Sequence, residues 1–587
     1  MAKQTHPAQI ILRWSDHVPE SDVLDPLGLG LRGSARLGSR LLFCITSITP
    51  RARYFSFLPW AVYDYQKQEM GKPYALGLKG AIVLREQAFT LGCVAHHEGK
   101  SCAGGALVGS EQAAKWYAKH ENQADFRKLK NFAKNPALAA YYNSIVNLGV
   151  FITDDERPVT DEEEENPDLT FDDLELSPLG LKLAKRYESA VGAVAAMKHI
   201  GAKQRTSSVN GLAELGKYGG LCELANTPSP DRELLRDVFF AKVDPKSGSH
   251  EFRRRSLLLI LAVCEKICTD QWLLNEPAFE SIVYYGEIAN DDDRLAMHIP
   301  KQLNDIATRW RMFYFHHYMS VALEGLFSWL VSNLGENGLA GSTLETLAAK
   351  LDEASVGKQL SEVLEVNLRG SFGKLSPSKL FSTLGFSGGN LDVSLSKVMD
   401  KKIRSLAPFA EDSLESVIRD KTYLYSSTGL ALPLILLATT LARYKQWEST
   451  NYGDWLANVA SDPYLDLIPP IVTQGLSRHF DNWWGCSWKE LAVFVLSKYV
   501  VQQHQSMSYE KTWAGDRCLI QVDGPRVISK GNYEKIGMGN PRLRSAIQIL
   551  RDLGLIEDDS EQITRLTKEG KKFLEQEMVR ETKNEVS

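Results

Sequence analysis

The sequence predicts a mainly α-helical protein with several domains, and three observations support this prediction. From about Asp125 onward, apolar residues recur at the three- and four-residue spacing of amphipathic helices. A chain of 587 residues is long enough for about three to four domains. A helical motif that begins with Asn-Pro and ends in Leu-Gly occurs twice, at 135–155 and 540–559. The protein therefore contains a repeated helical element.

The composition is that of a globular protein, with 44% apolar and 24% charged residues. The longest apolar runs, 257–264 and 429–442, are shorter than the ~20 residues of a membrane-spanning helix and predict buried helices. No apolar segment of signal-peptide length lies near the N-terminus, and the eight cysteines form no paired CxxC framework. We therefore expect a cytoplasmic protein with no membrane contact.

The net charge of −5 is unevenly distributed along the chain. Between Thr153 and Glu175 there are twelve acidic residues and one arginine, a local charge of −11 that leaves +6 for the rest. The average thus hides a mildly basic protein with an acidic insert.

The C-terminal copy of the motif has the element order found in the second half of a winged helix-turn-helix domain. A glycine, Gly554, ends the predicted helix, and a polar stretch, a strand at 563–566 and a threonine-capped helix follow. The apolar face of the first helix consists of Leu543, Ala546, Ile547, Leu550 and Leu553.

The N-terminal copy shows the same order with a longer connection. Its glycines, Gly149 and Gly180, are 31 residues apart, whereas Gly554 and Gly570 are 16 apart. The extra 15 residues fall in the acidic run, so this copy is predicted to have a lengthened, acidic wing. Its apolar face consists of Leu138, Tyr141, Tyr142, Ile145 and Leu148.

These patterns divide the chain into six predicted parts. The last of them includes two short strands around Asp523-Gly524, a hairpin signal. The parts are a Gly/aromatic-rich domain (1–120), a winged-helix-like module with an acidic insert (121–190), a helical domain (191–368), a linker (369–394), a second helical domain (395–505) and a C-terminal winged-helix-like module (506–587).

Only the C-terminal copy has a polar stripe suited to nucleic acid. Its first helix presents Arg544, Gln548 and Arg551 beside the apolar face, and Arg and Gln are the side chains best suited to guanine and adenine edges. The segment 511–551 has eight basic and three acidic residues, which favours a polyanion. The corresponding positions in the first copy are Ala139, Asn143 and Val146.

We therefore predict that the C-terminal module binds DNA as a duplex and that the first copy is a protein-docking or autoinhibitory module. The alternative is that both copies are packing modules and that the arginines form a solvated helix face. The predicted DNA-binding residues are Arg526, Lys530, Lys535, Arg542, Arg544, Gln548, Arg551 and Arg565.

Two further basic clusters are candidates for nucleic-acid contact. Arg51, Arg53 and Tyr54 lie next to aromatic residues and could stack on a single strand or, alternatively, anchor a helix to the core. A second cluster at the start of an apolar helix has the alternative of a solvated helix end. It consists of Arg253, Arg254 and Arg255.

No constellation of residues predicts a catalytic, metal or cofactor site. His317 and Glu324 share a helical face and are suited to acid–base chemistry, but core packing is the preferred interpretation. The glycines at 28–38 are followed by no Gly-Lys-Ser/Thr, so we expect no nucleotide site. The conceivable zinc ligands, for which a helical interpretation is preferred, are Cys93, His96, His97 and Cys102.

The N-terminal block resembles the start of a family of bacterial defence-island proteins. The resemblance covers about the first 60 residues well and the middle of the chain loosely. The matching residues are Leu27-Gly28-Leu29-Gly30, Thr46-Ser47, Arg51-Ala52-Arg53-Tyr54-Phe55 and Pro59-Trp60. Such proteins are encoded beside helicases and nucleases, so the resemblance implies a role against phage or plasmid DNA, and it supplies no catalytic residues.

From these features we expect a DNA-binding adaptor or sensor of a defence system, non-catalytic by itself, with a helicase or nuclease as partner. The first alternative is a nuclease or other nucleic-acid-processing enzyme with a site around His317 and Glu324. The second is a protein scaffold that does not bind DNA.

Overall fold

The computed structural model of the chain is mainly helical, which confirms the predicted fold class. No helix among the residues listed below is long and apolar enough to cross a membrane. The structure describes residues 25–30, 36–73, 75–100, 107–120, 123–125, 129, 132–133, 136–152, 174–200, 206–222, 224, 229–241, 248–267, 273–289, 294–296, 298–336, 341–364, 367–383, 410–448, 480–510, 518–536, 542–559 and 563–586.

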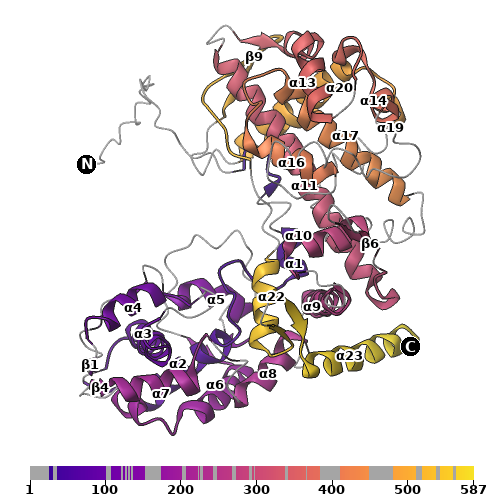
Figure 1. Cartoon of the computed structure of the whole chain (residues 1–587). Helices are drawn as coiled ribbons and strands as arrows, with labels where there is room; N and C mark the ends of the chain where they lie inside the picture. The colour runs from indigo at the N-terminus through magenta and orange to yellow at the C-terminus, as the bar shows by residue number, and fades with distance from the viewer. Residues whose placement is uncertain are drawn as a thin grey trace, which may run out of the picture. The chain divides into compact units, whose positions relative to one another are not determined.

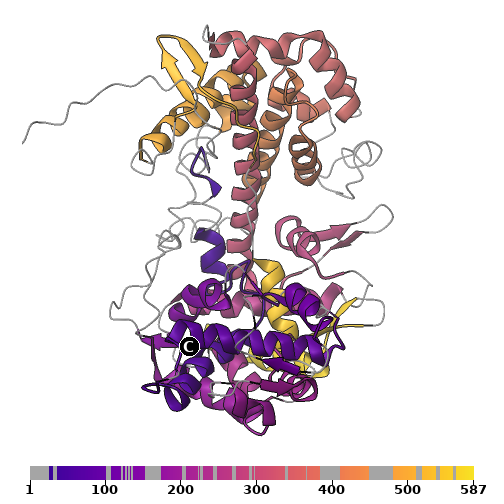
Figure 2. The same ribbon diagram turned by 90° about the vertical axis from the view of Figure 1, so that its left-hand side faces the viewer.

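The chain forms two compact units, each assembled from separate stretches of sequence (Figure 1). Unit A comprises Arg32–His316, Trp447–Leu467 and Gly539–Ser587. Unit B comprises Met1–Leu31, His317–Gln446 and Ile468–Met538. The uninterrupted helix α11 (Asn304–Glu336), seen along its length in Figure 2, contributes residues to both units.

Unit A contains most of the helices of the N-terminal half together with the C-terminal segment. Its helices besides α11 are α1 (Arg36–Leu41), α2 (Tyr54–Gln68), α3 (Leu78–His96), α4 (Ser110–Tyr117), α5 (Ala137–Asn147), α6 (Pro178–Val191), α7 (Val209–Gly219), α8 (Pro230–Phe239), α9 (Gly248–Ile267), α10 (Glu276–Glu280), α22 (Leu543–Asp552), α23 (Lys568–Val586), the 3₁₀ turns η4 (Ala195–His199) and η7 (Lys301–Leu303) and the π-helical turn η6 (Ser281–Tyr285).

The described strands of unit A form four antiparallel pairs, and each pair is a separate two-stranded sheet. The pairs are β1 (Gln123–Asp125) with β4 (Thr206–Ser208), β2 (Phe151–Ile152) with β3 (Glu175–Leu176), β5 (Glu287–Ala289) with β6 (Arg294–Ala296), and β10 (Ile556–Asp558) with β11 (Thr564–Leu566).

Helix α2 lies in the core of unit A, because ten of its fifteen residues are buried. Its Phe57 and Trp60 pack edge-on against Phe89 of α3, with ring centroids 5.4 and 5.3 Å apart. Helices α3 and α7 approach so closely that a Cβ atom on Gly216 would lie 2.1 Å from the carbonyl oxygen of Gly92. The predicted buried helix at 257–264 is confirmed within α9, since all eight of these residues are buried.

Unit B is built around α11 and α17 (Thr428–Glu448), and the predicted buried helix at 429–442 is confirmed within α17. Its remaining elements are β7 (Ser342–Thr343), α12 (Leu344–Ala349), η9 (Lys350–Asp352), α13 (Ala354–Leu364), η10 (Phe372–Lys374), α14 (Pro377–Thr383), α16 (Ala410–Asp420), α19 (Phe480–Trp484), α20 (Trp488–Val495), η13 (Leu496–Val501), α21 (Gln502–Glu510), β8 (Ile520–Asp523) and β9 (Arg526–Ser529).

The sheet of unit B has the strand order β7-β9-β8 and is antiparallel throughout. The hairpin predicted around Asp523-Gly524 is confirmed, because β8 and β9 pair directly and Gly524 turns between them with a φ of 56°. The glycine-containing segment 25–30 packs on α21, where Gln503 and His504 bond the carbonyl oxygens of Leu27 and Pro26 at 2.9 Å.

The C-terminal module predicted at 506–587 has residues in both units. Residues 506–538, which include the β8–β9 hairpin, belong to unit B, whereas 539–587 belong to unit A. The predicted C-terminal module is therefore divided, and only its second part lies in the same unit as the N-terminal copy of the motif.

Candidate nucleic-acid interface

The two copies of the sequence motif have the same local structure in unit A. Each consists of a helix, a two-stranded antiparallel sheet and a second helix, α5–β2–β3–α6 and α22–β10–β11–α23. The first helix ends in both copies at a glycine with positive φ, 72° at Gly149 and 71° at Gly554. The amide of the following residue then donates to the carbonyl five positions earlier, at 3.2 and 3.0 Å. The helix stop predicted from Leu-Gly is thus formed twice with one geometry.

The start of the second helix is also the same in both copies. A hydroxyl, from Ser177 or Thr567, donates to the carbonyl of the helix-ending glycine at 2.6 or 2.8 Å. The same oxygen accepts from the amide of Gly180 or Gly570 at 3.0 or 2.8 Å, which is an N-cap bond. One side chain therefore joins the end of the first helix to the start of the second.

The two hairpins have the same register next to the helices. Phe151 pairs with Leu176 in the first copy, and Ile556 pairs with Leu566 in the second. The 15 additional residues of the first copy fall between its strands, as the sequence predicts, and lie within 153–173, outside the described residues. The repeated motif is consequently a duplicated structural element with one insertion.

The predicted polar stripe lies on the accessible side of α22. Seven of the ten residues of this helix are buried, whereas Arg544 is exposed and Gln548 and Arg551 are half-buried. The equivalent stripe of α5 has the same exposure pattern but no charge. It consists of Ala139, which is exposed, and Asn143 and Val146, which are half-buried.

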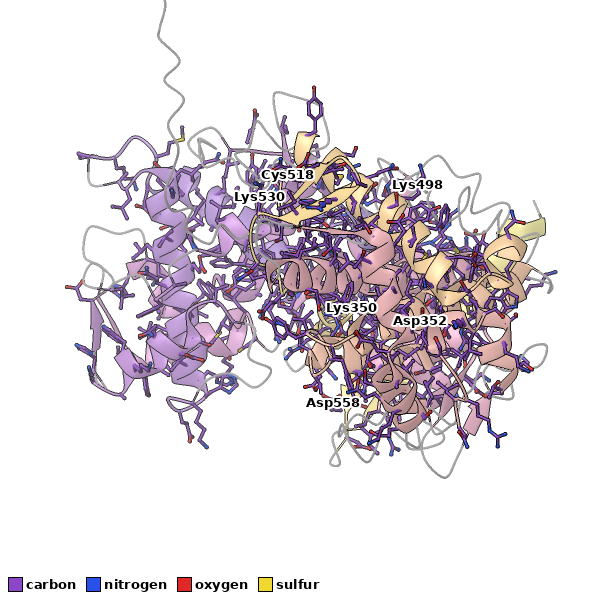
Figure 3. The ribbon with its side chains drawn as sticks, turned by 90° about the horizontal axis from the view of Figure 1, so that it is seen from above. Lys350, Asp352, Lys498, Cys518, Lys530 and Asp558 are labelled. Carbon is purple, nitrogen blue, oxygen red and sulfur yellow. The ribbon has the colours of Figure 1, made fainter. Side chains whose placement is uncertain are left out.

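Carboxylates of the adjacent hairpin neutralise part of the positive charge. Arg551 forms an ion pair with Asp558, labelled in Figure 3, at 2.9 Å and donates to the hydroxyl of Thr564 at 3.0 Å. Arg565 forms an ion pair with Asp559 at 2.8 Å. Among the residues that the structure describes, no carboxylate pairs with the guanidinium of Arg544. Arg544 is therefore the arginine of this stripe that is best placed for an external anion.

Of the remaining predicted DNA-binding residues, Arg542 is half-buried and lies in unit A. Its guanidinium donates to the carbonyl of Ile45 at 3.4 Å, and its φ of 58° precedes the first turn of α22. Arg526, Lys530 and Lys535 are exposed and belong to unit B, on or just after β9, and Lys530 is labelled in Figure 3. The predicted set is thus divided between the two units.

The structure corrects the predicted nucleic-acid contact of Arg51, Arg53 and Tyr54, since all three are buried in unit A. Arg53 donates to the carbonyls of Gly220 and Tyr218 at 2.8 and 2.7 Å. A buried guanidinium that is bonded to backbone carbonyls has no face to offer a base or phosphate. The alternative interpretation, that this block anchors a helix to the core, is the one that its burial supports.

Arg51 joins the two copies of the motif. Its amide donates to the Tyr141 hydroxyl on α5 at 3.0 Å, and its guanidinium forms an ion pair with Asp552 on α22 at 3.0 Å. The next amide, of Ala52, donates to the same carboxylate at 2.9 Å. Sequence analysis did not identify Asp552 or Tyr141, because a buried partner about 90 or 500 positions away leaves no local signal.

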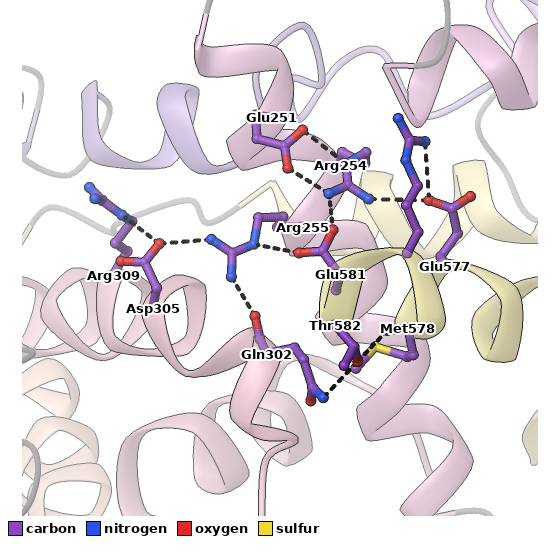
Figure 4. Close-up of polar contacts among 11 residues, drawn as sticks. Glu251, Arg254, Arg255, Gln302, Asp305, Arg309, Glu577, Met578, Glu581 and Thr582 are labelled. Carbon is purple, nitrogen blue, oxygen red and sulfur yellow. Dashed lines mark hydrogen bonds and ion pairs between the residues drawn. The ribbon is translucent and has the colours of Figure 1, made fainter. Parts of the chain in front are cut away.

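Contacts within unit A also occupy Arg253, Arg254 and Arg255, and Figure 4 shows those of Arg254 and Arg255. Arg253 is fully buried and donates to the carbonyls of Phe239 and Val238 at 3.0 and 2.8 Å. The two arginines that follow contact carboxylates of α23 and α11. Arg254 pairs with Glu577 at 3.1 Å and with Glu581, and Arg255 pairs with Glu581 at 3.2 Å and with Asp305 at 3.0 Å.

The histidine considered for acid–base chemistry has a different partner from the one its spacing suggests. His317 contacts both carboxylate oxygens of Glu415 on α16 at 3.0 Å, and Glu324 is buried in unit B. Despite burial, His317 and Arg419 hold the pKa of Glu415 at about 2. This arrangement is a hydrogen-bonded network between α11 and α16.

Of the conceivable zinc ligands, Cys93 is buried, His96 is exposed and Cys102 lies outside the described residues. Within the described ranges, no group of three or more His, Cys, Asp or Glu side chains is arranged to hold a metal ion.

Glu86 on α3 caps the start of α5. Both of its carboxylate oxygens lie 3.0 Å from the amide nitrogen of Ala137, the first residue of α5. Burial raises the pKa of Glu86 to about 7, although the hydrogen bond from Ala137 opposes the shift. The folded protein therefore holds a proton on Glu86 at pH values where the unfolded chain has released it.

We expect the stability of the α5 region to fall as the pH rises from about 5 to 8. The folded-state pKa of Glu86 lies above its ordinary value of 4.5, so its contribution is complete below pH 4.5 and is lost as the pH rises through about 7. The loss of this contribution lowers the free energy of local unfolding of α5 by roughly 3 kcal/mol. Hydrogen exchange of the α5 amides, corrected for intrinsic rates, measures it, and Glu86→Gln should flatten the profile. An equal slope in the variant would contradict the assignment.

Comparison with known proteins identifies no relative for this chain. No protein-family model, no curated protein and no solved structure matches it. The duplicated element and its exposed stripe are therefore the observations on which a function can be argued.

Proposed function

We propose that this chain is a DNA-binding adaptor of a bacterial defence system and that it contacts duplex DNA through α22. The observation that favours this proposal is the stripe of exposed Arg544 and half-buried Gln548 and Arg551 on the accessible side of α22, whose other residues are all buried. The chemistry would be supplied by a partner protein, such as a helicase or nuclease.

The elements around α22 support a winged-helix interpretation. A helix followed directly by a two-stranded hairpin is the arrangement in which a helix-turn-helix protein inserts its recognition helix into the major groove. An arginine donates to both acceptors of a guanine edge, N7 and O6, whereas a glutamine donates to N7 of adenine and accepts from its N6 amino group. In this interpretation Arg544 and Gln548 face the bases, and Arg551 positions the wing through Asp558.

The uncharged copy of the motif is proposed to have a different role. Its stripe has the same exposure but presents Ala139, Asn143 and Val146, and its insert contains the acidic run, which would repel phosphate. We assign it to protein docking or autoinhibition. The defence context itself rests on the resemblance of the N-terminal block, whose residues 51–60 are buried and comprise the start of α2 and the three residues before it.

Anisotropy of a fluorescent duplex and of a single strand across a salt series would test the proposal. We expect wild-type protein to bind the duplex with a steep dependence on salt, because binding releases counterions. Arg544→Glu should weaken binding by about tenfold or more and reduce the salt slope by about 1. Arg551 is left unchanged, because its bonds to Asp558 and Thr564 support the hairpin.

Lys115→Glu provides the matched control, since it makes the same change in charge on an exposed residue of α4. Equal losses of DNA affinity in the two variants would mean that binding depends only on the net charge of the protein, which would overturn the assignment to α22. Wild-type protein that binds no DNA at low salt would select the alternative of a scaffold.

A further inference from the structure

Cys222 and His97 bring a thiol and an imidazole into contact in unit A. The Sγ atom of Cys222 lies 3.4 Å from Nε2 of His97. His97 directly follows α3, and Cys222 is the third residue after α7. Because α3 and α7 touch through their glycines at 92 and 216, the packing of these helices fixes the two groups next to each other.

Two basic side chains, of Arg51 and His97, contact Cys222. The guanidinium of Arg51 donates to the carbonyl of Cys222 and to that of Leu221. His97 is the residue that caps the C-terminal end of α3. Other titratable groups near this site, among the residues that the structure describes, include Cys93, His96, Tyr141 and Asp552, and Asp552 is paired with Arg51.

Cys44 in the same unit provides an internal comparison. The two cysteines are similarly buried, with exposed fractions of 5% for Cys44 and 7% for Cys222. Burial raises the pKa of Cys44 to about 12, even though Arg253 and Arg542 oppose the shift. A guanidinium cannot take the proton of a thiol, whereas a neutral imidazole can. The two sites therefore differ in the group next to the thiol, which is the imidazole of His97 at Cys222 and the guanidinium of Arg253 at Cys44.

We propose that Cys222 and His97 form a reactive thiolate–imidazolium pair and that Cys222 is a site of oxidation by small hydroperoxides. A nucleophile and a base within hydrogen-bonding distance are the requirement for an activated thiol. The small exposed fraction of Cys222 restricts the oxidant to a molecule of about the size of hydrogen peroxide.

The reaction is a two-electron oxidation of sulfur. His97 accepts the proton of the Cys222 thiol, and the thiolate attacks one oxygen of hydrogen peroxide. A sulfur–oxygen bond forms and the oxygen–oxygen bond breaks, so that hydroxide leaves and takes the proton from the imidazolium to become water. The products are the sulfenic acid of Cys222 and one molecule of water, and neutral His97 is regenerated.

The test is to treat the reduced full-length protein with hydrogen peroxide at pH 7, trap sulfenic acids with dimedone, and quantify each cysteine peptide by mass spectrometry. We expect Cys222 to react up to about thirtyfold faster than an ordinary thiol, which is only about 3% ionised at this pH, and by a still larger factor than Cys44, whose pKa is raised to about 12. His97→Gln, which retains a polar side chain but cannot take the proton, should remove this advantage and leave Cys44 unchanged.

A Cys222 rate no higher than that of Cys44, or an undiminished rate in His97→Gln, would overturn the proposal. The pH dependence of the Cys222 oxidation rate in the wild-type protein provides a second test that requires no variant. The Cys222 rate should already be near its plateau at pH 7, whereas the rate of an unassisted thiol rises about tenfold per pH unit up to its pKa. A Cys222 rate that rises in this way would likewise overturn the proposal.

Discussion

Replacing Gly570 with alanine is expected to separate α23 from the hairpin of the C-terminal copy. An added Cβ atom would lie 1.9 Å from the carbonyl oxygen of Leu555, which is much closer than a carbon and an oxygen atom can approach without a steric clash. That oxygen accepts a hydrogen bond from the amide of Thr567, the residue before α23, at 3.1 Å. A shift of the helix therefore breaks this bond to Leu555, the residue before β10. We expect a loss of about 3 kcal/mol or more in the free energy of opening of this element.

Gly180→Ala should have a parallel effect in the N-terminal copy, where the added atom would lie 2.2 Å from the carbonyl oxygen of Val150. Gly248→Ala is the control, because the same atom meets nothing within 4 Å at the start of α9. Hydrogen exchange followed by mass spectrometry is the appropriate measurement, since a chain with two compact units has no single unfolding free energy. Wild-type protection of α22 and α23 in Gly570→Ala would contradict the packing described above.

The local structure of the duplicated element could be predicted from sequence because its signals are local. The Leu-Gly helix stop, the hydroxyl cap and the glycine three residues later all lie within about 17 residues in the C-terminal copy. The stripe of Arg544, Gln548 and Arg551 follows from helical periodicity alone, and the exposure of α22 agrees with it. The buried helices α9 and α17 were predictable for the same reason.

The partners of the predicted arginines could not be derived in this way. The pairing of Arg551 with Asp558 depends on the register of a hairpin, and the sequence alone does not fix that register. Arg51 and Arg53 lie next to aromatic residues, a pattern that serves equally for stacking on bases and for filling a core. Whether these arginines are buried decides between the two interpretations. Their burial depends on backbone carbonyl acceptors near residue 220, about 170 positions away in the sequence.

Removal of the Asp552 carboxylate is expected to destabilise the contact between Arg51 and α22. Asp552→Ala leaves a buried guanidinium without its counter-ion and the amide of Ala52 without its acceptor. Breaking one partner of a buried ion pair costs about 3–5 kcal/mol. Faster hydrogen exchange in α22 and in residues 51–58 would report this loss, and Asp558→Asn is the control. Its exposed pair with Arg551 contributes at most about 1 kcal/mol.

The double variant Arg51→Met/Asp552→Leu separates charge from packing. If the cost of Asp552→Ala comes from an uncompensated buried charge, an apolar pair of similar size should recover much of the lost protection. Recovery would be incomplete, because Arg51 also bonds the carbonyls of Leu221 and Cys222. A double variant less protected than Asp552→Ala would mean that Arg51 stabilises the fold mainly through those carbonyls. In that case the ion pair positions α22 without contributing the larger part of its stability.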